Sequence, residues 1–552
     1  MILPSVRQAT DWAVEKLPPP SSRGIISLVL ITILLSGSVW WLIRDPKFAG
    51  QLVLETAFHD VVTYGALDAD PESVFHAAAS GLFSKLDPFS AYMLPEDYNV
   101  FEEETGGEYV GIGVEIKLTA SAIVIVHVFA QSPAADAMLV PGDRIVAVDG
   151  VSTAGFTMRQ SLDAMRGPAE TTVRLTVQSV SGRERELELE RRAVTVSPFP
   201  IHGIARSGCG YIRWTDFTDG SADRLAAIVE AIRVEDPSGI VIDLRGNPGG
   251  ILDEAVDAAG IFLPSGSLVC RLIGRDPREN VDYRTSQPPA QYDGPIVIVQ
   301  DDQSASSSEV FAAALQESGR AAVVGRKSFG KGWVQNIYDL DDGSALRLST
   351  ARYYTPQGRT FGNPSAFAVE DTLSGDSSVV KPAGLDPDVV VPATPVGPWR
   401  ETLAERGLVA DFVLAHQDEW TDENEVLDEL HDWCDSLGVL PVTPGGEAEA
   451  EDWRVNPQRS PHWKAWEKIF KALDTAQVND AELLFNREAE NLYLMLLEER
   501  LSTSPEPDEE ELETYMSLDP DLAEALDLIE DTDHYHDVVA RWQTQMSDHV
   551  TQ

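Results

Sequence analysis

The stretch Gly239–Gly250 reads GIVIDLRGNPGG, an apolar strand-like run that ends in a glycine-rich turn. A helical pattern follows at once over Ile251–Phe262. The same alternation continues on both sides, with strand-like runs at 210–214, 240–244, 268–273, 296–299 and 321–324, and helical runs at 222–233 and 309–317. Strands that alternate with helices predict an α/β domain with a largely parallel sheet.

Three turns of this predicted domain carry residues suited to chemistry. Paired glycines at Gly249–Gly250 leave backbone N–H groups free at a helix N-terminus. The second turn, SASSSE at 304–309, places small hydroxyl residues between a strand and a helix, where they either cap the helix or expose a nucleophile. The capping interpretation is stronger for Ser308 than for Ser306. The third turn, FGKG at 329–332, holds Lys331 between glycines.

A serine nucleophile needs a base, and the predicted α/β domain has no histidine between His202 and His416. A lysine can take that role when burial lowers its pKa from about 10.4 towards about 7–8. The flanking glycines favour Lys331, and Lys327 is the competing candidate. The spacing therefore makes a Ser–Lys dyad a candidate for the site.

A nucleotide site is the main rival interpretation of the lysine turn. Residues 325–332 match G-x-x-x-x-G-K, but the Ser/Thr that would hold magnesium is missing. An apparent strand follows over 333–338, where a phosphate loop needs a helix. Both departures argue against a phosphate loop.

The composition excludes several classes of protein. The 552 residues suggest about three or four domains. A formal charge of −48 disfavours nucleic-acid binding, and three cysteines are too few for a disulfide framework or a zinc site. Residues 401–552 hold 39 acidic and 9 basic residues, a net of −30. This acidic tail is helical by pattern, and a solvated surface is its simplest interpretation.

Residues Gly24–Ile43 form a run of 20 residues without a charge, long enough to cross a bilayer as a helix. The 23 residues before it are long for a signal peptide, so an uncleaved anchor is favoured over a cleaved signal at Ser36–Ser38. We therefore expect a membrane-anchored protein with a cytoplasmic stub at 1–23 and the bulk on the extracytoplasmic, periplasmic side.

Two further regions lie between this segment and the α/β domain. Residues 44–105 are helical by pattern, and 106–192 alternate short β-rich runs with turns, as in a small β-sandwich-like module. The predicted organisation is therefore 1–23, 24–43, 44–105, 106–192, a core at 193–400 and an acidic helical region at 401–552.

These motifs resemble those of the carboxyl-terminal processing, or tail-specific, proteases, a family of serine peptidases with a PDZ domain and a Ser–Lys site. The similarity runs from about Leu86 to Val391, in matching order and separation. It covers LDPFSAYMLPEDYNVFEEETGGEYVGIGVEI, SPAADAMLVPGDRIVAVDG, GIVIDLRGNPGG, SASSSEVFAAAL, VVGRKSFGKGWVQ and GLDPDVVV. The resemblance implies a crotonase-like α/β protease core at 193–400, with an inserted or adjacent PDZ domain at 106–192.

The resemblance also implies roles for single residues. Ser306 would be the nucleophile, Lys331 the base, and Gln335 would help to orient the lysine. The backbone N–H groups of Gly250 and Ser307 would form the oxyanion hole, although the family more often has alanine at the latter position. Phe89 stands where histidine is common, and no consequence is evident from the sequence.

The resemblance implies that the PDZ domain binds substrate C-termini. The turn Gly111, Ile112, Gly113 and Val114 would present N–H groups to a terminal carboxylate. The implied partners are proteins or peptides with exposed C-termini, and the membrane through the anchor. No nucleic acid, metal or cofactor is called for. The oligomeric state, an activating partner and the role of the acidic tail stay open.

Two other functions compete with a serine endopeptidase. A non-catalytic PDZ binding protein would have no need of Ser306, Lys331 and Gln335 together. An acyl-CoA enzyme on a related crotonase-like fold would lack the PDZ module, and the catalytic acids of that chemistry are missing here.

Overall fold

A computed structural model gives the structure of the chain. It describes residues 46–65, 70–84, 86–118, 123–129, 131–179, 182–286, 292–362, 384–393, 481–503 and 507–550, together with isolated positions between 409 and 433. The chain divides into two compact units, Met1–Leu86 and Asp87–Gln552.

The described part of the first unit is helical, as the pattern of 44–105 predicts. It contains α3 (Pro46–Tyr64) and α4 (Pro71–Phe83). Helix α4 begins after Asp70, whose carboxylate accepts the N–H of Ser73 at 2.9 Å. The predicted anchor at 24–43 lies outside the described residues. Within the described ranges, no helix is long and apolar enough to cross a membrane.

The second unit begins with a short strand and a helix that lead into the β-rich module. These are β1 (Ala91–Met93) and α5 (Pro95–Gly106). The module contains β2 (Glu108–Gly111), β3 (Val114–Leu118), β4 (Ile123–Val128), α6 (Pro133–Asp136), β5 (Arg144–Val148), β6 (Val151–Ser152), α7 (Met158–Met165), β7 (Thr172–Gln178), β8 (Glu184–Glu190) and β9 (Arg192–Thr195). One sheet has the order β3-β4-β5-β7-β8, with β6 on β5, and β2 pairs separately with β9.

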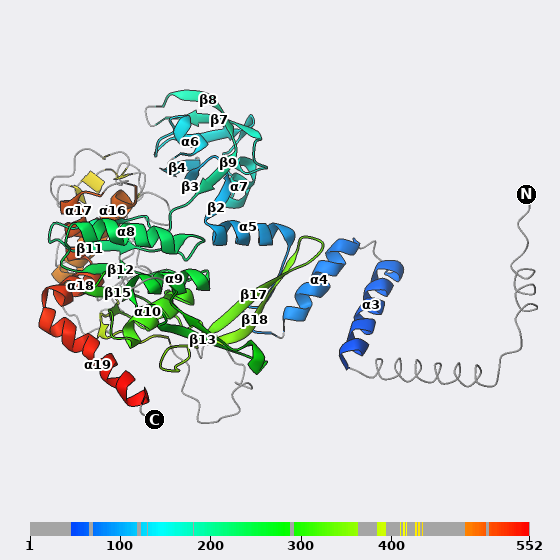
Figure 1. The fold of residues 1–552 in the computed structure, drawn as a ribbon. Coiled ribbons are helices and arrows are strands. Elements are labelled where there is room, and N and C mark those ends of the chain that lie inside the picture. Colours follow the sequence, from blue (N-terminus) through cyan, green and yellow to red (C-terminus); the bar gives the residue numbers. More distant parts are fainter. Residues whose placement is uncertain are drawn as a thin grey trace, which may run out of the picture. The chain divides into compact units, whose positions relative to one another are not determined.

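A six-stranded sheet forms the centre of the α/β domain (Figure 1). Its strands, in spatial order, are β10 (His202–Ile204), β11 (Gly210–Arg213), β12 (Ile240–Asp243), β15 (Ile296–Gln300), β16 (Ala322–Gly325) and β19 (Val389–Val390). All neighbours are parallel except the edge pair β10 and β11. The predicted largely parallel sheet is therefore confirmed, and the carboxyl ends of β12, β15 and β16 meet at one edge.

The predicted strand at 268–273 exists, but it belongs to a second, antiparallel sheet. This sheet has the order β1-β18-β13-β14, with β17 on β18. Its later strands are β13 (Leu268–Gly274), β14 (Val281–Arg284), β17 (Trp333–Asp339) and β18 (Ala345–Tyr354). Strand β13 finds its partner in β18, the long arm of the hairpin that follows the lysine turn, rather than in the parallel strands nearest in sequence.

Helices cover both faces of the parallel sheet. One face packs against α8 (Ser221–Val234), α9 (Leu252–Phe262) and α10 (Ser307–Glu317). The other packs against α16 (Ala481–Thr503), α17 (Glu509–Leu518), α18 (Pro520–Glu530) and α19 (Thr532–Val550). Alternate side chains of each strand point to opposite faces of the sheet. Ile242 packs on the side of α8, α9 and α10, and Val241 packs on the side of the C-terminal helices.

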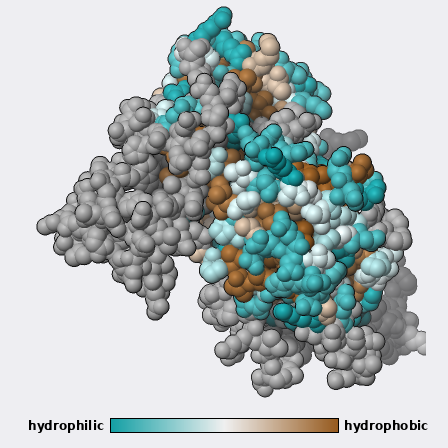
Figure 2. Space-filling model, turned by 90° about the vertical axis from the view of Figure 1, so that its left-hand side faces the viewer, coloured by the Kyte–Doolittle hydropathy of each residue, from teal (hydrophilic) through white to brown (hydrophobic). Residues whose placement is uncertain are grey.

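The acidic region therefore contributes one layer of the core in its described part, where the sequence predicted a separate region with a solvated surface. Its buried apolar residues, among them Leu522, Leu528 and Ile529, lie in one cluster with strand residues of the sheet. Figure 2 views the molecule from the side that carries α17, α18 and α19, and hydrophilic residues alternate there with smaller apolar areas. Acidic residues such as Asp527 and Glu530 are exposed on α18, whereas the side of this helix that faces the sheet carries the buried apolar residues.

Candidate active site

The three predicted turns follow neighbouring parallel strands. The glycine turn follows β12, the serine turn follows β15, and the lysine turn follows β16. Ala305 donates its N–H to the carbonyl of Asn247 at 3.0 Å, and Phe329 donates its N–H to the carbonyl of Ser304 at 2.9 Å. Backbone hydrogen bonds therefore join all three turns into one assembly.

Ser306 is the N-cap residue of α10 and has an unusual backbone conformation. Its φ is 55° and its ψ is −115°, a region that non-glycine residues rarely adopt, and the residue is 6% exposed. The helix begins at Ser307, two residues earlier than the pattern predicted. The stronger capping interpretation of Ser308 is wrong, because the Ser308 hydroxyl donates to the carbonyl of Asn247 at 3.0 Å.

The Ser306 hydroxyl interacts with the phenol of Tyr353 on β18. Tyr353 is buried, and burial raises its pKa, while the contact with Ser306 lowers it by a smaller amount. Tyr353 therefore stays neutral beside the serine. The sequence contained no motif that pointed to this tyrosine.

Gly250 and Ser307 lie together beside Ser306. In the part of the chain that the structure describes, neither of their N–H groups has an acceptor. Gly250 has φ of 148°, and a Cβ there would lie 2.3 Å from the carbonyl oxygen of Phe217, so only glycine fits. The Ser307 hydroxyl donates to the carbonyl of Gly250 at 2.9 Å. Two unpaired N–H groups in a fixed arrangement can bind an oxyanion.

Glu309 is fully buried and connects the serine turn to the lysine turn. Its Oε2 accepts the N–H of Ser306 at 2.9 Å and the N–H of Lys331 at 2.8 Å. Its Oε1 accepts the N–H of Gly330 at 2.8 Å and the hydroxyl of Ser328. Burial raises the pKa of this carboxyl, and the hydrogen bonds oppose that shift. The sequence placed Glu309 in the serine motif but gave it no role.

Burial lowers the pKa of Lys331, and the positive charge of Arg347 lowers it further, against a smaller opposing effect of Glu309. Its Nζ lies 5.2 Å from the ring centroid of Phe89. The sequence showed no consequence of phenylalanine at position 89, but the ring of Phe89 supplies an apolar wall beside the Lys331 amino group. A lysine with a lowered pKa is a candidate general base.

The Gln335 side chain binds the chain segment that carries this ring. Its Nε2 donates to the carbonyl of Phe89 at 2.9 Å, and Nε of Arg347 donates to the same oxygen at 3.0 Å. Gln335 therefore holds Phe89, which lies beside Lys331. Lys327, the competing base, lies 2.6 Å from Asp386 and its side chain is 50% exposed.

The β-rich module has a cavity of about 340 Å³ beside the turn 111–114. Its lining is mostly apolar and includes Ile112, Val114, Ile116, Phe129 and Leu162. Gly113 has φ of 79°, and a Cβ there would lie 2.1 Å from Cβ of Ser132, so this turn requires glycine. The cavity can take an apolar side chain next to the turn.

The fold and the site define a mixed α/β serine peptidase that carries a PDZ domain. Residues 208–370 match Peptidase family S41, and residues 124–179 match the PDZ domain. Two carboxyl-terminal processing proteases are also 32% identical to the chain over 73% and 79% of their own length, so the chain belongs to peptidase family S41, among these proteases.

Two relatives match along most of their own length. The carboxy-terminal-processing protease of Bartonella bacilliformis is 32% identical over 338 residues, which cover 60% of this chain and 73% of that one. The carboxyl-terminal-processing protease of Synechocystis sp. is 32% identical over 356 residues, which cover 63% and 79%. A solved structure, the photosystem II D1 C-terminal processing protease, is 23% identical and covers 65% of this chain and 97% of that one, with a TM-score of 0.35.

Proposed function

We propose that the chain is an endopeptidase that uses Ser306 and Lys331 as a catalytic dyad on proteins presented by their C-terminal tails. The observation that carries the proposal is the binding of the Ser306 and Lys331 backbones by the same carboxylate oxygen of Glu309. Two turns that lie 25 residues apart in the sequence are thereby held together.

Each group has a step in the proposed reaction. Neutral Lys331 takes the hydroxyl proton of Ser306 as its oxygen attacks the peptide carbonyl carbon. The carbonyl electron pair moves to oxygen, and the N–H groups of Gly250 and Ser307 bind that oxyanion. Each donor contributes about 3–4 kcal/mol to such a transition state. Lys331 then protonates the leaving amine, and water releases the acyl group by the same steps.

The PDZ domain would supply the substrate. N–H groups of the turn Gly111, Ile112, Gly113 and Val114 would bind the terminal carboxylate, and the peptide would extend the sheet as a strand. The apolar cavity beside the turn supports a preference for an apolar C-terminal residue. For the segment 24–43 we keep the proposal of a membrane anchor, with the bulk on the periplasmic side.

The test compares the full chain with Ser306→Ala and Lys331→Ala on an unfolded protein that ends in apolar residues. We expect cleavage by the parent alone, and labelling of Ser306 by a fluorophosphonate in the parent alone. Equal cleavage by all three proteins would reject the dyad. Peptide binding by the PDZ domain without cleavage or labelling in the parent would reject the enzyme in favour of a binding protein.

A further inference from the structure

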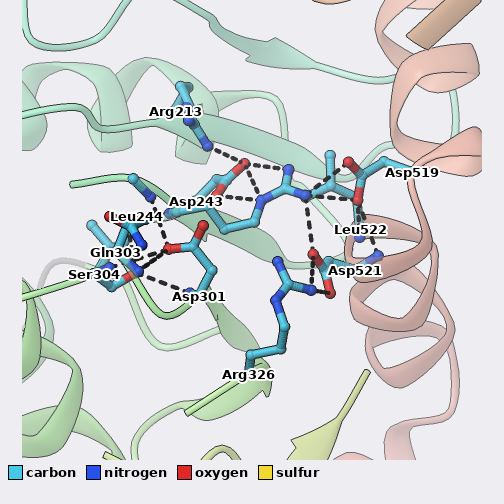
Figure 3. Close-up of polar contacts among 12 residues, drawn as sticks. Arg213, Asp243, Leu244, Asp301, Gln303, Ser304, Arg326, Asp519, Asp521 and Leu522 are labelled. Carbon is cyan, nitrogen blue, oxygen red and sulfur yellow. Dashed lines mark hydrogen bonds and ion pairs between the residues drawn. The ribbon is translucent and has the colours of Figure 1, made fainter. Parts of the chain in front are cut away.

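A buried ion network lies at the carboxyl ends of the parallel strands, on the side of the C-terminal helices (Figure 3). Its centre is Asp243, the last residue of β12, which is fully buried. Arg245 returns to this carboxylate, with Nε 2.9 Å from Oδ1 and Nη2 2.6 Å from Oδ2. Arg213 binds the same carboxylate at 2.8 Å. Burial alone would raise the pKa of Asp243, but the two arginines hold it below its ordinary range.

The start of α18 completes the network from the other end of the chain. Asp519 caps this helix by accepting the N–H groups of Asp521 and Leu522, and its two oxygens lie 2.9 and 2.7 Å from Nη1 of Arg245. Asp521 binds two arginines. Its Oδ2 lies 3.2 Å from Nη1 of Arg245, and both of its oxygens lie 3.0 Å from Nη1 of Arg326.

The two arginines belong to the turns that carry the proposed site. Arg245 opens the glycine turn that ends at Gly250, and Arg326 opens the turn that leads to Lys331. Asp301, which directly follows β15 and precedes the serine turn, accepts the N–H of Gly246 at 2.9 Å and the N–H of Ser304 at 3.1 Å. Asp521 therefore bridges the glycine turn, which carries Gly250, and the turn that leads to Lys331. Asp301 connects the serine turn to the glycine turn.

These ion pairs are shielded from water well enough to contribute to the position of the turns. The side chains of Arg245 and Asp521 are 12% and 6% exposed. An ion pair shielded from water is screened little by salt, and removal of one partner leaves the other charge without compensation. The helix itself is held independently, because Leu522, Leu528 and Ile529 pack in the cluster on the sheet. Loss of the ion pairs should therefore disturb the turns more than the docking of the helix.

We propose that Asp519 and Asp521 are positioning residues for the peptidase site. Through them the C-terminal helices hold the glycine turn and the lysine turn in their correct relative positions. The inference rests on the proposed function of Ser306 and Lys331. It assigns a role to a part of the acidic region that lies beyond residues 208–370, the part matched to the peptidase family. A shift of about 1 Å in a catalytic group can cost about 100-fold in rate, so small movements of these turns would be measurable.

The test uses the full chain with Asp521→Asn, Asp519→Asn, Arg326→Gln and the double change of Asp521 and Arg326. Asparagine keeps the capping function at 519, so that variant isolates the charge. Asp527→Asn is the matched control, because Asp527 is exposed on the same helix. The readouts are kcat and KM on the unfolded protein, the rate of Ser306 labelling by a fluorophosphonate, circular dichroism and Tm.

We expect Asp521→Asn to lower kcat about tenfold or more with KM within about twofold, and to slow labelling in parallel. The double variant should be no slower than the worse single variant, because both changes break the same link. Asp527→Asn should match the parent. If Asp521→Asn does not fold, Arg326→Gln at the partly exposed end of the network carries the same comparison, and Arg326→Lys should recover part of its loss.

Two results would overturn the inference. The first is parental kcat and labelling in folded Asp521→Asn and Arg326→Gln. The second is a loss of kcat that is additive in the double variant, because additivity means that the residues act separately. Ser306→Ala and Lys331→Ala separate this failure from that of the proposed function. If either keeps activity, the dyad is wrong; if both are inactive while the network variants match the parent, only the positioning role is wrong.

Discussion

Oε2 of Glu309 lies 2.8 Å from the backbone nitrogen of Lys331, and the same oxygen lies 2.9 Å from the backbone nitrogen of Ser306. One buried carboxylate thus binds the backbone just before α10, at Ser306, and the backbone two residues before β17, at Lys331. Because the hydrogen bonds are made by the backbone, they fix the two turns and leave the side chains of Ser306 and Lys331 free of this role.

We predict that Glu309→Gln abolishes most of the activity. The amide nitrogen would face backbone N–H groups that need an acceptor, which should cost about 3 kcal/mol of stability and about 10-fold or more in kcat. Glu317→Gln is the matched control, because Glu317 is also buried on α10 but binds Gln357 and Arg359. It should lower Tm with little change in kcat of the folded protein. Equal effects of the two variants on kcat would contradict the role of Glu309.

Burial is the largest cause of the lowered pKa of Lys331, and the charge of Arg347 should lower further the pH at which the enzyme gains activity. In the proposed mechanism the base is neutral Lys331, so the rate should rise with pH through the lowered pKa of that group. Arg347→Gln removes a repulsive charge, raises the pKa of Lys331, and should move the rising limb of kcat/KM to higher pH. Arg347→Lys keeps the charge and should keep the limb near its parental position. A pH–rate profile that is unchanged in Arg347→Gln would show that burial, without Arg347, lowers the pKa of Lys331.

Phe89 is a second residue that should affect the pKa of Lys331. Its ring both excludes water and attracts a cation, and these effects shift the pKa of Lys331 in opposite directions. Because burial is the largest cause of the lowered pKa, Phe89→Ala should move the rising limb to higher pH. Phe89→Leu keeps apolar bulk without the aromatic face, so its limb should stay near or below the parental pH. The pH profiles of both variants decide between the two effects, and a downward shift in Phe89→Ala would mean that the cation attraction dominates.

Ser307→Ala tests whether the hydroxyl of Ser307 supports the oxyanion hole. The backbone N–H stays, but the hydrogen bond to the carbonyl of Gly250 is lost. One neutral hydrogen bond contributes about 1 kcal/mol, so we expect about a fivefold fall in kcat with little change in KM. Ser308→Ala breaks the bond to Asn247 in the same turn and measures the general effect of losing one such bond. A parental kcat in Ser307→Ala would show that the backbone alone defines the hole.

The sequence allowed the parallel sheet, the β-rich module and the three turns to be predicted, because each is encoded by local periodicity and by glycines at fixed places. What it could not show depends on contacts between distant residues. Gln335 binds the carbonyl of Phe89 across 246 positions, and Arg245 binds Asp519 across 274. No local sequence pattern marks such pairs. The high charge of the acidic region also led to the prediction of a solvated surface, although one side of α18 is apolar and packs on the sheet.

Leu162→Asp tests recognition of substrate tails. Leu162 lines the cavity beside the turn 111–114. A carboxylate there would repel the terminal carboxylate of the peptide, and an apolar side chain in the cavity would bury that charge at a cost in free energy. Loss of an apolar contact and burial of a charge together should raise KM about tenfold or more for substrates with apolar C-termini. The value of kcat should change little, because Leu162 lies on α7 of the PDZ domain and touches none of the reacting groups. Asp163→Asn, an exposed change on the same helix, is the control, and a substrate with an amidated C-terminus should lose the difference between parent and Leu162→Asp. An unchanged KM in Leu162→Asp would mean that tails are read elsewhere on the chain.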